Sequence, residues 1–129
     1  MFIVVAGVPI PQGSMRHVGN GRIVSKNPKL KAWREKIASE VKAAHGEPEI
    51  DRPVRVSVIF NLPKPKSVKR NHPTVPPDLD KLQRAVGDAL SIDCKYLKDD
   101  SVICEWLSRK QYDAFPSVII AVEEITTRQ

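Results

Sequence analysis

The segment that most constrains the fold is one in which apolar and polar residues alternate. Successive side chains of an extended chain point to opposite faces, so alternation is typical of a strand that is buried on one face only. Residues 54–60 follow this pattern, with an apolar side (Val54, Val56, Val58 and Phe60) and a polar side (Arg55 and Ser57). We therefore expect a sheet that is covered by a second layer on one face.

Two amphipathic helices are predicted to form that second layer. Asn27 and Pro28 are typical of an N-cap and a first helical position, and Gly46 and Pro48 end the first helix. Between them runs an apolar stripe at spacings of three and four, formed by Leu30, Trp33, Ile37, Val41 and Ala44. A second helix is expected from about residue 80 to 91, with an inward side formed by Leu82, Val86, Ala89 and Leu90.

The other elements are short. A buried strand is expected over residues 2–6, and two late strands at roughly 101–108 and 117–124. Asn20-Gly21 predicts a hairpin, because both central positions of the favoured turn need positive φ. A proline-rich, basic loop fills 61–77.

Length and composition fit one domain. The chain has 129 residues, of which 41% are hydrophobic, and it contains no repeat and no dividing linker. The sequence thus predicts an α+β fold: a single two-layer domain over 1–129, with a mixed sheet of about four strands plus an N-terminal hairpin, packed with two main helices. Trp33 and Trp106 are expected to fill its core.

The charge balance favours a polyanionic partner. There are 21 Lys and Arg against 15 Asp and Glu, a net charge of +6. Aromatic residues make up only 5%, which argues against a binder of single strands or RNA, since such proteins stack bases on aromatic rings. No segment is long enough to span a membrane. Cys94 and Cys104 lack the spacing of a zinc site and are expected to be reduced, as in the cytoplasm.

Carboxylates nevertheless gather at one point of this basic chain. Asp78 and Asp80 follow Pro77, which favours an extended backbone before it. Asp80 and Gln83 match the capping-box pattern, so we expect the helix to start just after Asp80 and both carboxylates to share a face of the extended segment. Two close carboxylates repel each other unless a cation lies between them, and oxygen ligands select Mg²⁺ or Mn²⁺.

A third carboxylate would complete a metal site of the nuclease kind, in which the ion activates a water and shields the scissile phosphate. The candidate is Asp100, at the entry to a late strand. Strand periodicity leaves the choice between neighbours open, because Asp100 shares a face with Trp106 while Asp99 shares one with Glu105.

Cationic side chains stand beside these aspartates. Arg84 lies four residues after Asp80, so it reaches the same end of the helix, and Lys81 is close by. Arg84 or Lys81 would stabilise negative charge on a phosphate in the transition state. In the alternative, Arg84 only pairs with Asp80 and Asp88 on a solvated helix face.

Further basic residues are candidate phosphate contacts, and as a group they predict strongly salt-dependent DNA binding. They lie in the hairpin and in the proline-rich loop: Arg16, Arg22, Lys26, Lys64, Lys66 and Lys69.

The stretch PPDLDKLQRAVGDALSIDCKYLKDDSVI, residues 76–103, resembles the RusA-type Holliday junction resolvases. The family pattern there is an Asp-x-Asp-x-Leu helix start, an Asp-x-Leu turn of helix, a short loop, and an Asp-Asp pair before a strand. A late strand followed by a lysine, here Lys110, and a tryptophan-bearing first helix fit more loosely. The resemblance extends over nearly the whole chain, but its specific part is this central block.

The resemblance implies a function and a set of residues. The family resolves four-way DNA junctions with magnesium, for which manganese would substitute, and it acts as a homodimer with one site in each subunit. Carried over by position, the metal ligands would be Asp78, Asp80 and Asp100. Arg84 stands where the family often has a catalytic lysine, and Lys81 and Lys110 join the candidate DNA contacts. Many relatives are encoded by phages or prophages, which implies action in the cytoplasm of a bacterial host.

A non-enzymatic alternative is an architectural DNA-binding module in which the aspartates are only helix caps. It predicts no cutting with any metal, and DNA binding that Asp80→Asn leaves unchanged. The nuclease hypothesis instead predicts paired cutting of a four-way junction.

Overall fold

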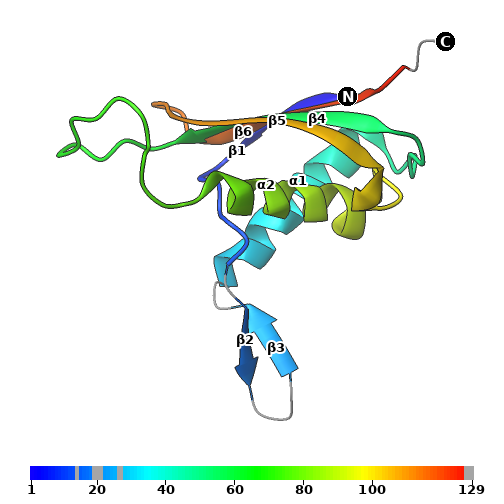
Figure 1. The fold of residues 1–129 in the computed structure, drawn as a ribbon, viewed down its shortest axis with the longest axis horizontal. Coiled ribbons are helices and arrows are strands. Elements are labelled where there is room, and N and C mark those ends of the chain that lie inside the picture. Colours follow the sequence, from blue (N-terminus) through cyan, green and yellow to red (C-terminus); the bar gives the residue numbers. More distant parts are fainter. Residues whose placement is uncertain (14, 19–21, 26–27, 127–129) are drawn as a thin grey trace.

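In the computed structural model, residues 1–13, 15–18, 22–25 and 28–126 are described, and for 15–18 and 22–25 this covers the strands and their pairing. The elements in chain order (Figure 1) are β1 (Phe2–Ala6), β2 (Met15–Val18), β3 (Arg22–Ser25), α1 (Pro28–His45), β4 (Val54–Leu62), α2 (Leu79–Asp88), η1 (Ala89–Asp93), η2 (Asp100–Val102), β5 (Ile103–Tyr112) and β6 (Ser117–Glu124).

A four-stranded mixed sheet forms one layer, in the order β1-β6-β4-β5. Strand β6 pairs antiparallel with both β1 and β4, whereas β4 and β5 are parallel. Parallel neighbours need a crossover connection, which the segment containing α2 supplies. Both helices lie on the same side of the sheet (Figure 1), so the predicted α+β class is confirmed.

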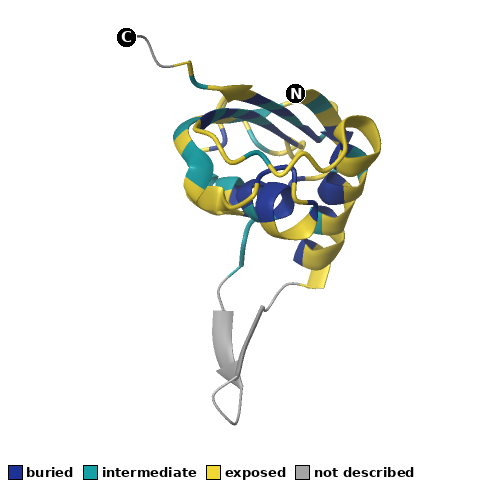
Figure 2. Cartoon of the chain, turned by 90° about the vertical axis from the view of Figure 1, so that its right-hand side faces the viewer, coloured by how far each residue is buried: buried dark blue, intermediate teal, exposed yellow. Residues whose placement is uncertain are grey.

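The core lies between these two layers, as Figure 2 shows for the inward sides of the helices. Four residues of the predicted stripe of α1 are at most 5% exposed: Leu30, Trp33, Ile37 and Val41. Ala44 is exposed, so the buried stripe ends one turn earlier than predicted. The alternation in β4 is confirmed, since Val54, Val56, Val58 and Phe60 are all at most 1% exposed.

The bounds of the second helix differ from the prediction. The N-cap of α2 is Asp78, with extended φ −71° and ψ 140°, and its side chain makes no capping hydrogen bond. Its backbone carbonyl accepts from the amides of Lys81 (3.2 Å) and Leu82 (3.1 Å). Asp80 therefore lies in the first helical turn, and the prediction that the helix starts after Asp80 was wrong. At the other end α2 changes into the π-helical turn η1, in which the hydroxyl of Ser91 donates to the carbonyl of Gly87 (2.7 Å).

The predicted N-terminal hairpin is present. Strands β2 and β3 pair antiparallel, from Met15 opposite Ser25 to Val18 opposite Arg22, and Figure 1 shows them apart from the main sheet. The predicted turn at Asn20-Gly21 and the predicted N-cap Asn27 lie outside the described residues. Pro28 is the first residue of α1, as predicted.

The face of the sheet away from the helices is open and largely apolar. Strand register aligns Phe2, Ala121, Ser57 and Leu107 in one row across it, and Val4, Ile119, Ile59 and Arg109 in the next. Phe2 is 64% exposed and Leu107 53% exposed, and both border a shallow hollow of about 430 Å³. None of the described helices is both long and apolar enough to cross a membrane.

Candidate active site

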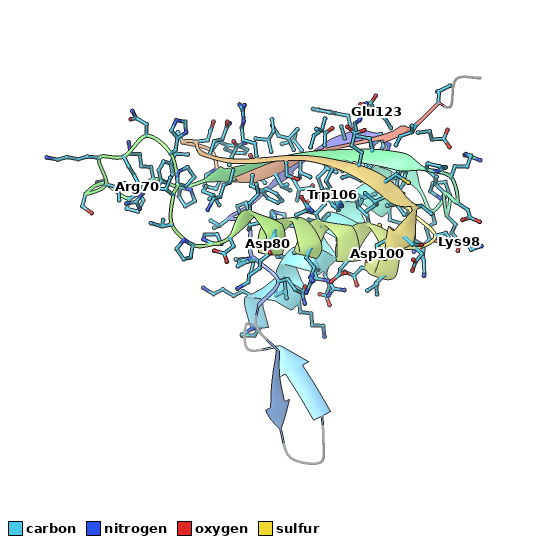
Figure 3. The ribbon with its side chains drawn as sticks, in the orientation of Figure 1. Arg70, Asp80, Lys98, Asp100, Trp106 and Glu123 are labelled. Atoms are coloured by element: carbon cyan, nitrogen blue, oxygen red, sulfur yellow. The ribbon has the colours of Figure 1, made fainter. Side chains whose placement is uncertain are left out.

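A cleft of about 490 Å³ lies between α2, the segment after β1 and the start of β5. Three carboxylates line it, those of Asp80, Asp88 and Asp100, together with the cationic side chains of Lys81 and Arg84. The remaining lining residues include Gln12, Gln83, Gly87, Ile103 and Trp106. Figure 3 shows Asp80 near the first turn of α2 and Asp100 toward the opposite end of that helix.

Helix α2 sets the spacing of the charges. Asp80, Arg84 and Asp88 follow each other at intervals of four residues and so form one stripe along the helix. A rise of 1.5 Å per residue separates Asp80 from Asp88 by about 12 Å along the axis. The cleft is therefore a groove with Asp80 at one end, Asp88 at the other, and the guanidinium of Arg84 between them.

Burial and neighbouring charges act together on the carboxylate of Asp88. Burial raises its pKa above 3.8, the nearby Arg34 lowers it, and the negative charge of Asp100 raises it further. Nη1 of Arg34 lies 3.6 Å from Oδ2 of Asp88, while the same guanidinium donates two hydrogen bonds to Asp93, at 2.7 and 2.8 Å. The charges of Asp88 and Asp100 thus disfavour each other, and a cation in the groove would relieve that repulsion.

The two late aspartates have different environments. Oδ2 of Asp99 accepts from the backbone amide of Ser101 at 3.0 Å and so caps η2. Hydrogen bonding to the side chain of Ser101, and then to its backbone amide, lowers the pKa of Asp99. Asp100 lines the cleft. Strand periodicity left the choice between the two open, and Asp100 is the one that lines the cleft and acts on the charge of Asp88.

Asp78 is not among the residues that line the cleft. Its carboxylate lies 3.7 Å from Nζ of Lys81, and both side chains are about half exposed, at 55% and 49%. Within the described part of the chain, no three His, Cys, Asp or Glu side chains are grouped so that they could hold a metal ion. The ligand roles of Asp78, Asp80 and Asp100 therefore stay predictions.

The donors in the groove nevertheless fit a hard divalent ion. The side-chain Oε1 of Gln12, which lines the same cleft, is buried and has no hydrogen-bond partner among the described residues. Leaving such an acceptor unpaired costs about 1–3 kcal/mol. Carboxylate and amide oxygens are the ligands that Mg²⁺ and Mn²⁺ prefer. Asp80, Asp88, Asp100 and Gln12 together supply that chemistry.

Arg84 is exposed at the mouth of the groove. Among the described residues, none of the ion pairs involves its guanidinium, so the predicted alternative of a plain pair with Asp80 or Asp88 is not formed. Its charge still acts on Asp88, whose pKa it lowers. An unpaired guanidinium between carboxylates is available to bind a phosphate.

The predicted DNA contacts fall into two groups. The loop lysines Lys64, Lys66 and Lys69 are exposed, and Nζ of Lys64 lies 5.8 Å from the ring centre of Tyr112. Nε of Arg70 donates to the hydroxyl of the same tyrosine at 2.9 Å. The end of β5 thereby supports the basic loop. In the hairpin, the side chains of Arg16 and Arg22 are not described, and Lys26 lies outside the described residues.

Lys110 differs from the other candidate contacts because its ammonium turns inward. It donates to the backbone carbonyls of Val75 and Pro77, each at 2.9 Å. Lys110 is not a free surface charge.

Sequence reasoning missed three groups in the cleft. Asp88 was considered only as a partner of Arg84, although it stands in the quoted Asp-x-Leu turn. Trp106 was assigned to the core, but it is only partly buried and lines the cleft. Nothing in the sequence singles out Gln12, because its place beside α2 depends on a tertiary hydrogen bond from its backbone amide to the backbone carbonyl of Lys81 (2.9 Å).

A two-layer α+β domain with carboxylates and an unpaired guanidinium in one groove has the features of a nuclease that works with a metal ion. Comparison with protein families agrees with this class. The family described as endodeoxyribonuclease RusA matches residues 6–123. The chain belongs to this family, whose members resolve Holliday junctions and are generally metal-dependent, so the predicted family and enzyme class are confirmed. Comparison with curated proteins gave no match.

Proposed function

We propose that this protein cuts four-way DNA junctions in a Mg²⁺-dependent reaction, as a homodimer that makes two symmetrical incisions. The observation that carries the proposal is the groove lined by Asp80, Asp88 and Asp100 together with Arg84, which forms no ion pair within the described part of the chain. Asp100 is a proposed ligand inside the groove, together with Asp88, on whose carboxylate its charge acts, or with Asp80. Asp78 joins them when its exposed carboxylate leaves Lys81, a rearrangement of a weak surface ion pair.

The residues of the groove divide the chemistry between them. A divalent ion held by these carboxylates would supply a water of lowered pKa and would offset phosphate charge. The guanidinium of Arg84 would bind the non-bridging oxygens of the phosphate as negative charge develops on them. Arg presents a planar fork of donors, so it would hold the phosphate in one orientation, which a lysine would not.

The basic loop supports binding of the DNA backbone. Lys64, Lys66 and Lys69 are exposed on a segment that contains several prolines and is braced by Tyr112. Because these charges stand on a stiffened loop, they lose less freedom on binding than charges on a mobile one. As an enzyme of DNA junctions, the protein would act in the cytoplasm of a bacterial host.

The open face of the sheet supports the homodimer. Phe2, Val4 and Leu107 are 45–64% exposed there, and Phe2 and Leu107 border the 430 Å³ hollow. An isolated domain gains nothing from this apolar surface, whereas a second copy packed on it buries both faces. A two-fold dimer offers two matched grooves to a substrate that needs two cuts.

Single-turnover cleavage of a synthetic four-way junction tests the proposal. Linear duplex and flap substrates serve as controls, each with Mg²⁺, with Mn²⁺ and with EDTA. We expect paired nicks in the junction with either ion, and loss of cutting but not of binding in Asp80→Asn and Asp100→Asn. Intact junctions at every ion and protein concentration, with binding unaltered by Asp80→Asn, would instead support the architectural alternative.

A further inference from the structure

We infer that Lys110 is a positioning residue for the groove and not a DNA contact. Its ammonium holds the segment before α2, and thereby holds Asp78 and Asp80 in register with Asp100. This inference rests on the proposed function, because the groove matters only if it is the catalytic site. The structural part of the inference can be measured without metal or DNA.

The first observation is that the segment before α2 lacks donors of its own. Pro76 and Pro77 have no backbone N–H, so local hydrogen bonds that would fix the chain here are missing. The carbonyls of Val75 and Pro77 are satisfied by Nζ of Lys110, at 2.9 Å each. A lysine ammonium has three donors and no acceptor, so one group can bind both carbonyls.

The second observation is that alternate residues of β5 contact α2 and the segment just before it. Side chains of alternate strand residues share a face, and Trp106, Ser108 and Lys110 are such a set. A Cβ built on Gly87 would lie 3.4 Å from Cζ2 of Trp106. The hydroxyl of Ser108 donates to Oε1 of Gln83 at 2.6 Å.

These contacts progress in opposite directions along the two elements. As β5 advances from Trp106 to Lys110, its partners step back from Gly87 through Gln83 to Pro77. Figure 3 places Trp106 between the sheet and α2. Asp100 opens the short turn η2 that leads directly into β5. Strand β5 thus connects both ends of the groove. Asp100 lies just before its start, and Lys110, farther along it, binds the segment that precedes Asp78.

The start of α2 depends on this anchor because no N-cap side chain fixes it, and the other tertiary hydrogen bond to its first turn, from the backbone amide of Gln12 to the carbonyl of Lys81 (2.9 Å), lies after Asp80. Asp78 makes no side-chain cap, and its carbonyl accepts hydrogen bonds from the amides of Lys81 and Leu82 in the first turn. Pro77, which Lys110 holds, immediately precedes Asp78. Releasing Pro77 lets the first turn fray, and that turn carries Asp80.

The same hydrogen bonds argue against a DNA contact. Lys110 is partly buried, and two of its three donors are already used. Binding a phosphate would cost both carbonyl bonds. An exposed loop lysine such as Lys64 has no such cost.

Three variants separate the two roles: Lys110→Met, Lys64→Met as the example of a DNA contact, and Lys42→Met as the neutral control. Lys42 pairs with Glu47 after the end of α1 and lies outside the groove. Each variant removes one positive charge. The measurements are amide hydrogen exchange of the metal-free protein, the salt dependence of junction binding in EDTA, and single-turnover cleavage with Mg²⁺.

For Lys110→Met we expect the amides of Lys81 and Leu82 to exchange at least about tenfold faster, as loss of two hydrogen bonds implies, while those of α1 are unchanged. The slope of the logarithm of the junction-binding constant against the logarithm of the salt concentration stays that of wild type, and the single-turnover cleavage rate falls at least about tenfold. Lys64→Met should lower the slope by about 0.9 and leave exchange unchanged. Lys110→Arg keeps the donors and should retain the wild-type exchange pattern.

Two results would overturn the inference. One is unchanged exchange with a reduced salt slope in Lys110→Met, which would make Lys110 a phosphate contact. The other is faster exchange across α1 and α2 alike, which would make it a general stabiliser of the fold. If the wild-type protein fails to cut junctions, the proposed function fails, but the exchange result still decides whether Lys110 positions the helix start.

Discussion

Leu107→Lys is expected to break the proposed dimer. Leu107 lies in the middle of β5 with its side chain on the open face of the sheet, 53% exposed and bordering the apolar hollow. A lysine there keeps an extended backbone and removes no core contact of the monomer. The fold should survive, and the change should act on association alone.

The exposed fraction of Leu107 sets the size of the effect. Full burial of a leucine side chain is worth about 1.5–3 kcal/mol, so covering the exposed half is worth about 0.8–1.6 kcal/mol. In a two-fold dimer the residue occurs twice, which gives about 1.6–3.2 kcal/mol, a factor of about 15 to 200 in the dimer dissociation constant. Burying part of a charged lysine would add to this loss.

Sedimentation equilibrium of the wild-type protein and the variant measures that constant. The matched control is Ile92→Lys, because Ile92 is 63% exposed but lies in η1 and not on the sheet. We expect a dissociation constant at least about tenfold higher for Leu107→Lys and an unchanged one for Ile92→Lys. A wild-type monomer, or equal weakening by both substitutions, would refute the assignment of the sheet face as the dimer interface.

Three further predictions concern the groove, the loop and the core. Burial raises the pKa of Asp88 in the folded protein above its ordinary value of 3.8, so the ionised carboxylate destabilises the fold at pH 7. This destabilisation shrinks as the pH falls through the raised pKa and is gone below 3.8. Asp88→Asn should therefore have a higher melting temperature than wild type at pH 7, with the difference closing in acid, and a lower melting temperature at pH 7 would contradict this. Replacing Lys64, Lys66 and Lys69 together by Gln should lower the salt slope of junction binding by up to about 2.7, and an unaltered slope would exclude the loop from the interface. Leu82 is fully buried under the sheet, so denaturant unfolding of Leu82→Ala should show a loss of about 2–5 kcal/mol, and a loss well below that would mean its site is not packed as described.

The layers of the fold could be predicted because each rests on a local pattern. The alternation from Val54 to Phe60 and the stripe from Leu30 to Val41 each specify one buried face, and the structure buries both. Pro28 marks the start of α1 because a proline is well suited to the first helical position. Strand order and the parallel pairing of β4 with β5 were beyond such patterns, since they depend on contacts between distant segments.

The start of α2 shows where local patterns fail. The capping-box pattern pointed to Asp80, yet the helix begins two residues earlier at an N-cap whose side chain makes no hydrogen bond. The bonds that fix this point come from Lys110, thirty-odd residues later in the chain. The groove likewise depends in part on contacts between distant segments. Its aspartates were recognisable in sequence, whereas Gln12 joins them only through the bond to Lys81.

The proposed function requires a divalent ion in the groove along α2, bound by Asp100 and by Asp80 or Asp88. Anomalous diffraction at the manganese edge, from crystals of the protein soaked in Mn²⁺, would locate that ion. We expect a peak within the groove, with oxygens of Asp100 and of at least one of Asp78, Asp80 and Asp88 at ligand distance, and no peak in crystals of Asp100→Asn. A map without a peak among these oxygens, or one with the ion bound elsewhere on the protein, would contradict it.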